Sequence, residues 1–170
     1  MAFPDGLSPA QLLYPDLDTE LASTRKMLAL VPEGNDDYRP HDKSMKLGSL
    51  ATHLADLPSF GKVLLTTDFL DFAVTPFAPK AFTTTAERLE EFDRNAAEFT
   101  SSVATASWND LAQRWQLKMG EVVYVDDQKS NLVRPFAISH LAHHRAQLGV
   151  YLRLLGVPIP GTYGPSADEM

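Results

Sequence analysis

Four stretches of the chain repeat apolar side chains at alternating steps of three and four residues, the spacing that places them on one face of a helix. The stretches cover about residues 16–31, 47–66, 83–103 and 131–155. Gly156 follows the fourth stretch, as expected at the end of a helix. The pattern therefore predicts four amphipathic helices.

The segments between these helices predict how they connect. Residues 67–82 are long enough to run back along a bundle, so the third helix can lie parallel to the second. Residues 107–130 combine one short helical turn with a turn at Gly120, which predicts an irregular or hairpin-like excursion before the fourth helix. Pro58 lies inside the second helix and predicts a kink or a local break there. The expected fold is all-α, a four-helix bundle.

Composition narrows the class of protein. The chain has 170 residues, 44% of them hydrophobic and 22% charged, which fits one folded domain over residues 1–170. A formal net charge of −7 argues against binding to nucleic acid or to an anionic membrane. The chain has no cysteine, which excludes disulfides, thiolate metal sites and a cysteine nucleophile. Because no run is long and apolar enough to span a membrane and no signal-like start is present, we expect a cytoplasmic protein without a membrane partner.

Histidines supply the candidate chemistry. His140 and His144 are four residues apart on the fourth predicted helix, so their imidazoles project from one side of it. His53 lies on the apolar stripe of the second helix and is a candidate third ligand. Three neutral imidazoles suit zinc, nickel, cobalt or ferrous iron and leave coordination positions open, as in catalytic rather than structural sites. Burying them without a partner would cost several kcal/mol of desolvation.

Other arrangements of the same residues stay open. His143 is three residues from His140, so these two form a competing ligand pair. Alternatively, His143 supports the metal ligands without binding the metal, or it lies in an interface. Asp56 is three residues after His53 and either orients that imidazole or is an exposed helix charge. His41 lies in a polar loop and is expected to be solvated.

Motifs near the two histidine segments follow a known pattern. They are LATHL at residues 50–54, HLAHHRAQL at 140–148, YLR at 151–153 and YGPS at 163–166. Together they resemble the signature of the DinB-like (YfiT-like) metalloenzyme family, and the resemblance extends from about Leu17 to Ser166.

The resemblance implies a four-helix bundle with up-down-down-up topology. It implies a divalent metal ion, usually nickel or zinc, held by His53, His140 and His144. It also implies a homodimer that acts on a small-molecule substrate. Better-understood relatives transfer low-molecular-weight thiols, and others in the wider group are hydrolases.

Two classes of function follow. The first is a metal-dependent enzyme, a thiol S-transferase or a hydrolase, in which the metal activates a thiol or water for attack on an electrophile. No separate catalytic residue is assigned by the sequence. The second is a non-catalytic small-molecule-binding or stress-response module in which the metal only stiffens the bundle. A weaker third possibility is a structural dimer with a hydrogen-bonded histidine core.

Overall fold

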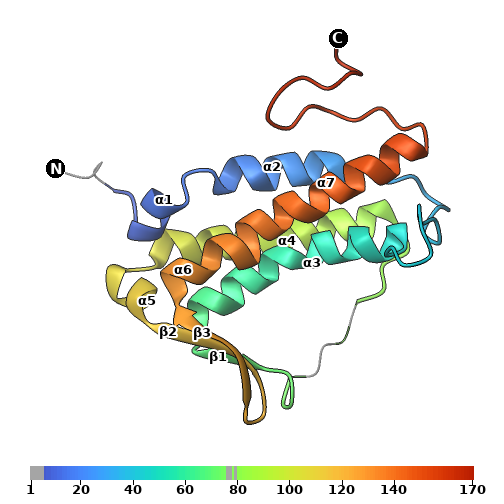
Figure 1. Ribbon diagram of the computed structural model, residues 1–170. Coiled ribbons are helices and arrows are strands. Elements are labelled where there is room, and N and C mark those ends of the chain that lie inside the picture. Colours follow the sequence, from blue (N-terminus) through green and yellow to red (C-terminus); the bar gives the residue numbers. More distant parts are fainter. Residues whose placement is uncertain (1–5, 76–77, 79) are drawn as a thin grey trace.

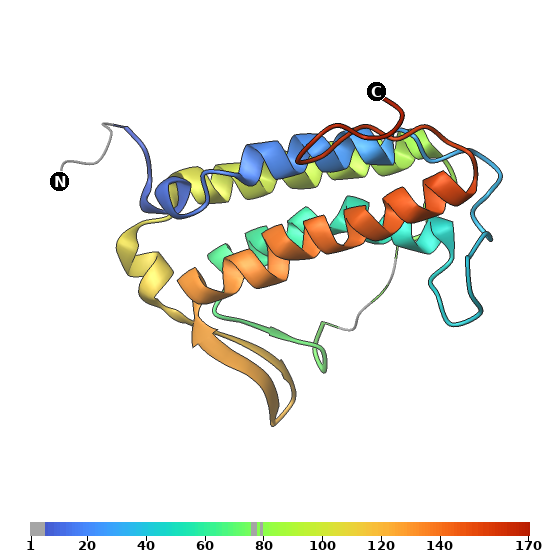
Figure 2. The same ribbon diagram turned by 45° about the horizontal axis from the view of Figure 1, so that its top comes forward.

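Four long helices form a bundle in the computed structural model, which describes residues 6–75, 78 and 80–170 (Figure 1). They are α2 (Leu17–Leu28), α3 (Leu47–Thr66), α4 (Thr85–Thr105) and α7 (Ser139–Leu154). Figures 1 and 2 show α2 and α7 running in one direction and α3 and α4 in the other. The helices therefore follow the expected up-down-down-up order, with α3 and α4 parallel. The prolines at positions 76 and 79 of the connection between them lie outside the described residues.

The helix ends follow local chemistry. The Thr84 side chain accepts a hydrogen bond from the Glu87 N–H while the Glu87 carboxylate accepts one from the Thr84 N–H, which caps the start of α4. Gly156 adopts a positive φ of 74° directly after α7, and the Val157 N–H donates to the Leu152 carbonyl at 2.9 Å. This left-handed turn ends the helix where the glycine predicted it. α2 ends at Leu28, three residues before the predicted end.

The fourth predicted helix is not uniform. It consists of α6 (Lys129–Val133), a π-helical turn η1 (Arg134–Ile138) and α7. Pro135 has no N–H to donate to the carbonyl four residues earlier, and the Ser139 N–H donates to the Arg134 carbonyl five residues back. The widened turn therefore lies directly before the segment that carries His140.

The bundle also carries a small sheet of three strands, β1 (Phe69–Asp71), β2 (Arg114–Met119) and β3 (Val122–Gln128). β2 and β3 form the expected hairpin, turning at Gly120 with a φ of 57°. β1 pairs in parallel with β2, so the expectation of a strictly all-α fold is wrong. Three residues are too few to show a strand periodicity, and their partner strand is distant in sequence.

Two short helices flank the core elements. α5 (Trp108–Ala112) is the predicted short helical turn before the hairpin. α1 (Pro9–Leu13) was not predicted, although the Ser8 side chain and Gln11 form a capping box at its start. Within the described residues, no helix is both long and apolar enough to cross a membrane.

The core lies between the four long helices and holds α3 against α4. The sequence predicted a kink or a local break at Pro58; α3 runs through Pro58 without a break, and Pro58 is itself buried in the core. One turn later, Gly61 faces the buried ring of Phe99 on α4. The absence of a side chain at Gly61 lets the two helices approach closely there. This packing fixes the position of α3, and with it the position of His53.

Candidate metal centre

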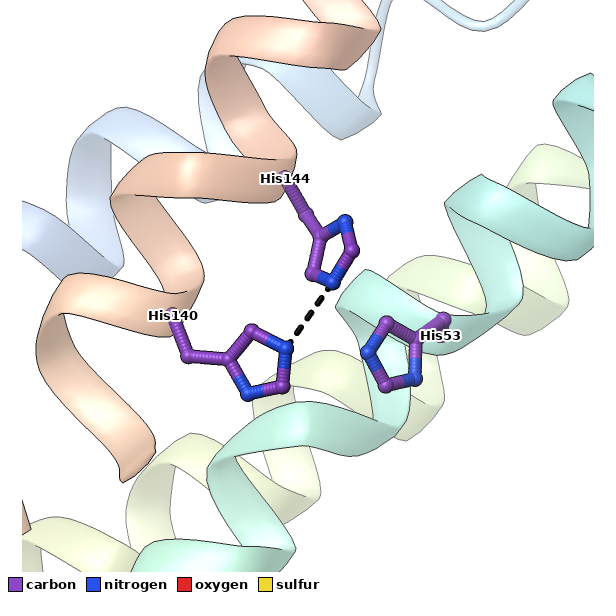
Figure 3. A group of neighbouring side chains, drawn as sticks. All are labelled: His53, His140 and His144. Atoms are coloured by element: carbon purple, nitrogen blue, oxygen red, sulfur yellow. Dashed lines mark hydrogen bonds between the residues drawn. The ribbon is translucent and has the colours of Figure 1, made fainter. Parts of the chain in front are cut away.

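Three imidazoles from two helices meet at one point of the bundle (Figure 3). His53 comes from α3, and His140 and His144 come from successive turns of α7. One ligand nitrogen from each ring lies within 4.8 Å of the other two. The His53 ring centre is 5.3 Å from that of His140 and 4.6 Å from that of His144. The structure therefore brings the three sequence-predicted ligands together.

The outer nitrogens of two of these rings are held by acceptors. The His144 Nδ1–H donates to Oε1 of Gln147 at 2.8 Å, and the His140 Nδ1–H donates to the Phe136 carbonyl at 3.3 Å. A carbonyl oxygen cannot donate, so each Nδ1 carries the ring proton and each Nε2 presents a lone pair. These two Nε2 atoms face each other at 2.9 Å. Two lone pairs in that position repel unless a cation lies beside both, so the donor set fits a metal ion.

Gln147 is the supporting residue that the sequence did not predict. Its amide N–H donates to Nε2 of His143 at 3.0 Å while its oxygen accepts from His144. With the amide in this orientation the His144 Nδ1–H is a donor and the His143 Nε2 an acceptor, and the opposite orientation would reverse both roles. The spacing of three and four residues from the two histidines was the available signal. His143 itself is exposed and takes no place among the three converging rings.

The site favours neutral imidazoles. Burial, together with the neighbouring His144 and His140 rings, lowers the pKa of His53 to about 4, against an opposing effect of Asp56. Burial likewise lowers the pKa of His140 and of His144. A metal ion binds only the unprotonated ring nitrogen, so a lowered pKa keeps these ligands available at neutral pH.

The remaining candidates have other partners. The Asp56 carboxylate accepts a hydrogen bond from Nζ of Lys80 at 2.7 Å, and no hydrogen bond joins it to His53 among the described residues. Of the two alternatives for Asp56, the orienting role is therefore not observed. His41 is exposed in its loop, where its Nδ1 accepts the Lys43 N–H.

Two cavities reach the histidines. One has a volume of about 450 Å³, is mostly apolar and is lined by His53 and His140 together with residues of α3, β1, β2 and η1. The other, about 940 Å³, is more polar and is lined by His140, His143, Ser139, Asn131 and Arg134, among others. His140 lines both cavities, and His53 lines the more apolar one.

An up-down-down-up helical bundle with a three-histidine centre defines the class of protein. The DinB family model matches residues 9–170, and the chain belongs to the DinB family. The Bacillus subtilis (strain 168) protein YrdA is 24% identical over 151 residues, which cover 88% of this chain and 85% of YrdA.

Solved structures share the fold. The DinB-like protein YjoA of Bacillus subtilis has a TM-score of 0.67 at 14% identity, covering 89% of this chain and 97% of YjoA. YfiT from Bacillus subtilis, described as a probable metal-dependent hydrolase with an unusual four-helix bundle topology, has a TM-score of 0.64 at 14% identity. That match covers 93% of this chain and 95% of YfiT. At such identities the likeness concerns the fold alone.

Proposed function

We propose that the protein is a metal-dependent enzyme whose divalent metal ion is held by His53, His140 and His144. The observation that carries this proposal is the convergence of one ligand nitrogen from each of the three rings, all within 4.8 Å of one another.

The arrangement supports catalysis better than a structural role. Three protein ligands leave room for a further ligand, whereas structural sites are normally closed by four. The 450 Å³ cavity lined by His53 and His140 gives a small molecule access to that position. When bound, the metal would lower the pKa of a coordinated water or thiol and so supply hydroxide or thiolate near neutral pH. The reaction class best supported is hydrolysis, since YfiT is described as a probable metal-dependent hydrolase.

Thiol S-transfer is the second candidate, and the two cavities favour it. A transfer reaction needs room for a thiol and for an electrophile, and His140 lines one apolar and one more polar cavity. The more polar cavity suits a hydrophilic low-molecular-weight thiol. The chain contains no cysteine, so the thiol has to come from solution.

Nickel or zinc is the metal that we propose. An all-imidazole donor set suits both ions, and the absence of thiolate or carboxylate ligands disfavours a site built for softer or harder cations.

The test uses protein purified without a metal-affinity column and then loaded with Ni²⁺ or Zn²⁺. Ester hydrolysis and thiol addition to electrophiles are measured for the wild type, His140→Ala and the control His41→Ala. We expect turnover that requires metal, is lost in His140→Ala and is kept in His41→Ala. Metal binding and metal-dependent stabilisation without turnover in either assay would instead support the non-catalytic binding module.

A further inference from the structure

The 450 Å³ cavity beside the histidines has mainly apolar walls. Its volume lies within the roughly 300–1,000 Å³ typical of small-molecule sites. Its apolar lining includes Phe60, Val63, Leu70, Phe72, Leu117 and Phe136. Side chains from the bundle, from the small sheet and from the π-helical turn therefore meet around one space, with His53 and His140 among its lining.

The polar lining is sparse and carries no positive charge. Asp56, Ser59 and Thr75 are the polar residues beside the histidines, and none of the described lining residues is Lys or Arg. Lys80, the cation paired with Asp56, also contacts Glu91, so its charge is already matched by carboxylates. In the metal-free protein, an anion entering this cavity would lose its hydration without gaining a cationic partner and would meet the Asp56 carboxylate.

Aromatic packing shapes one wall. The Phe60 ring lies 5.8 Å from the Trp115 ring, edge to face, and 6.0 Å from the Phe136 ring. Trp115 is fully buried, and its Nε1–H donates to the Thr67 hydroxyl at 3.1 Å, which holds the indole in place. Phe60 is thus supported from behind and presents a fixed aromatic surface to the cavity.

We infer that this cavity binds an uncharged small molecule with a flat aromatic or compact apolar body, whose polar group points toward His53 and His140. The placement of that polar group rests on the proposed function, because it brings the reacting atoms to the metal. The preference for a neutral apolar body rests on the cavity walls alone. It can therefore be tested whether or not the protein proves to be an enzyme.

The probes are 4-fluorobenzamide and 4-fluorobenzoate, which share a ring and differ in charge. Their binding to the full-length protein is followed by ¹⁹F NMR at neutral pH, as purified and again after treatment with EDTA. The EDTA-treated sample matters because a bound metal could itself ligate the benzoate. Val63→Phe fills the cavity, and Val122→Phe makes the same change at an exposed position of β3. Ser59→Trp, at a half-buried position of α3, is a second filling variant in case Val63→Phe does not fold.

In the EDTA-treated protein we expect the amide to bind at least tenfold more tightly than the benzoate. We expect Val63→Phe and Ser59→Trp to weaken amide binding at least tenfold, and Val122→Phe to leave it within twofold. Three results would overturn the inference: no amide binding at millimolar concentration, equal binding of the benzoate, or unchanged amide binding in a folded filling variant. If the protein binds the amide but never binds a metal, that result would contradict the proposed function without contradicting this inference.

Discussion

Gln147 and His144 are joined by a 2.8 Å hydrogen bond in which the ring donates from Nδ1, so the other ring nitrogen is left to face His140. The partners are three positions apart in the sequence, and both lie on α7. The helix thus carries a ligand together with the group that sets its tautomer. If the Gln147 amide orients His144, replacing Gln147 should alter metal binding although His144 itself is still present.

Replacing Gln147 by Leu should weaken divalent metal binding about 10- to 100-fold, the usual effect of removing a group that orients a ligating histidine. Leu keeps the approximate size of the side chain but offers no acceptor to the His144 Nδ1–H. The affinity is measured by competition with a chromophoric chelator. Gln147→Glu is the control, because it keeps an oxygen acceptor and should bind metal far better than the Leu variant. Equal affinities of the Leu variant and the wild type would contradict the assigned role.

A buried ion pair should contribute strongly to the stability of the bundle. Nη2 of Arg145 lies 2.7 Å from the Glu20 carboxylate, with side chains only 2% and 7% exposed, and the Tyr163 hydroxyl donates to the same carboxylate. Glu20→Ala leaves the Arg145 charge buried without its carboxylate, so we expect a loss of about 3 kcal/mol in the free energy of unfolding. Urea denaturation measures the loss.

An exposed pair serves as the control for that measurement. Arg25 donates two hydrogen bonds to Asp93, at 2.7 and 2.8 Å, yet both side chains are exposed. Asp93→Ala should therefore cost less than about 1 kcal/mol. Similar losses for Glu20→Ala and Asp93→Ala would show that burial of the Arg145 pair has little energetic effect.

The space beside two glycines, Gly61 on α3 and Gly149 on α7, predicts opposite effects of substitution by alanine. A methyl group at Gly61 would lie 2.5 Å from ring carbons of Phe99, which is fully buried. Gly61→Ala should therefore destabilise the protein by about 1–3 kcal/mol. At Gly149 on α7 the nearest atom would be 3.6 Å away, an ordinary contact. Gly149→Ala should stabilise the protein by up to about 1 kcal/mol, because alanine favours helix. Thermal and urea unfolding measure the change in stability of both variants. A stabilised Gly61→Ala or a destabilised Gly149→Ala would contradict the prediction.

Glu91 should give the bundle part of its resistance to acid. Hydrogen bonds from Arg94, and then from Lys80 and Asn95, lower the pKa of Glu91 from 4.5 to about 2. Since the folded-state pKa is the lower one, the stabilisation is fully present above about pH 4.5 and is lost as the pH falls toward 2. Lys80 and Arg94 are exposed, so solvent screening limits the contribution to about 1–2 kcal/mol.

The measurement compares the free energy of unfolding of the wild type with that of Glu91→Gln between pH 7 and pH 2. We expect a gap of about 1–2 kcal/mol near neutrality that closes as the pH falls. Glu90→Gln, a change at an exposed neighbouring position, should produce little gap at any pH. A Glu91→Gln gap that is independent of pH would contradict the assignment.

Much of the bundle could be predicted from local patterns. The apolar stripe predicted α3 with the bounds that the structure has, and Gly156 predicted the end of α7. β1 was missed because a three-residue strand exists only through its pairing with β2, in which each residue's partner is 47 positions away in sequence. The π-helical turn was not predicted, although Pro135, which has no N–H to donate to the carbonyl four residues earlier, lies within it.

The candidate site, like the fold, could be predicted from the sequence only in part. Helical spacing and the family resemblance predicted which three histidines would converge, because each lies on an inward-facing helix surface. The hydrogen bonds that set the tautomers depend on side-chain rotamers, so the sequence could not show that Gln147 holds His144. Nor could it show that Asp56 pairs with Lys80, since that contact joins α3 to the connection that follows it.

The most direct test of the account is the number of imidazoles that bind one metal ion. Co²⁺ titration, followed by visible absorption and X-ray absorption spectroscopy, gives both the stoichiometry and the count of histidine ligands. We predict one ion per chain with three imidazole ligands in the wild type and in His41→Ala, and greatly weakened binding in His53→Ala, His140→Ala and His144→Ala. Absence of a bound ion, or full binding in any one of those three variants, would contradict the account.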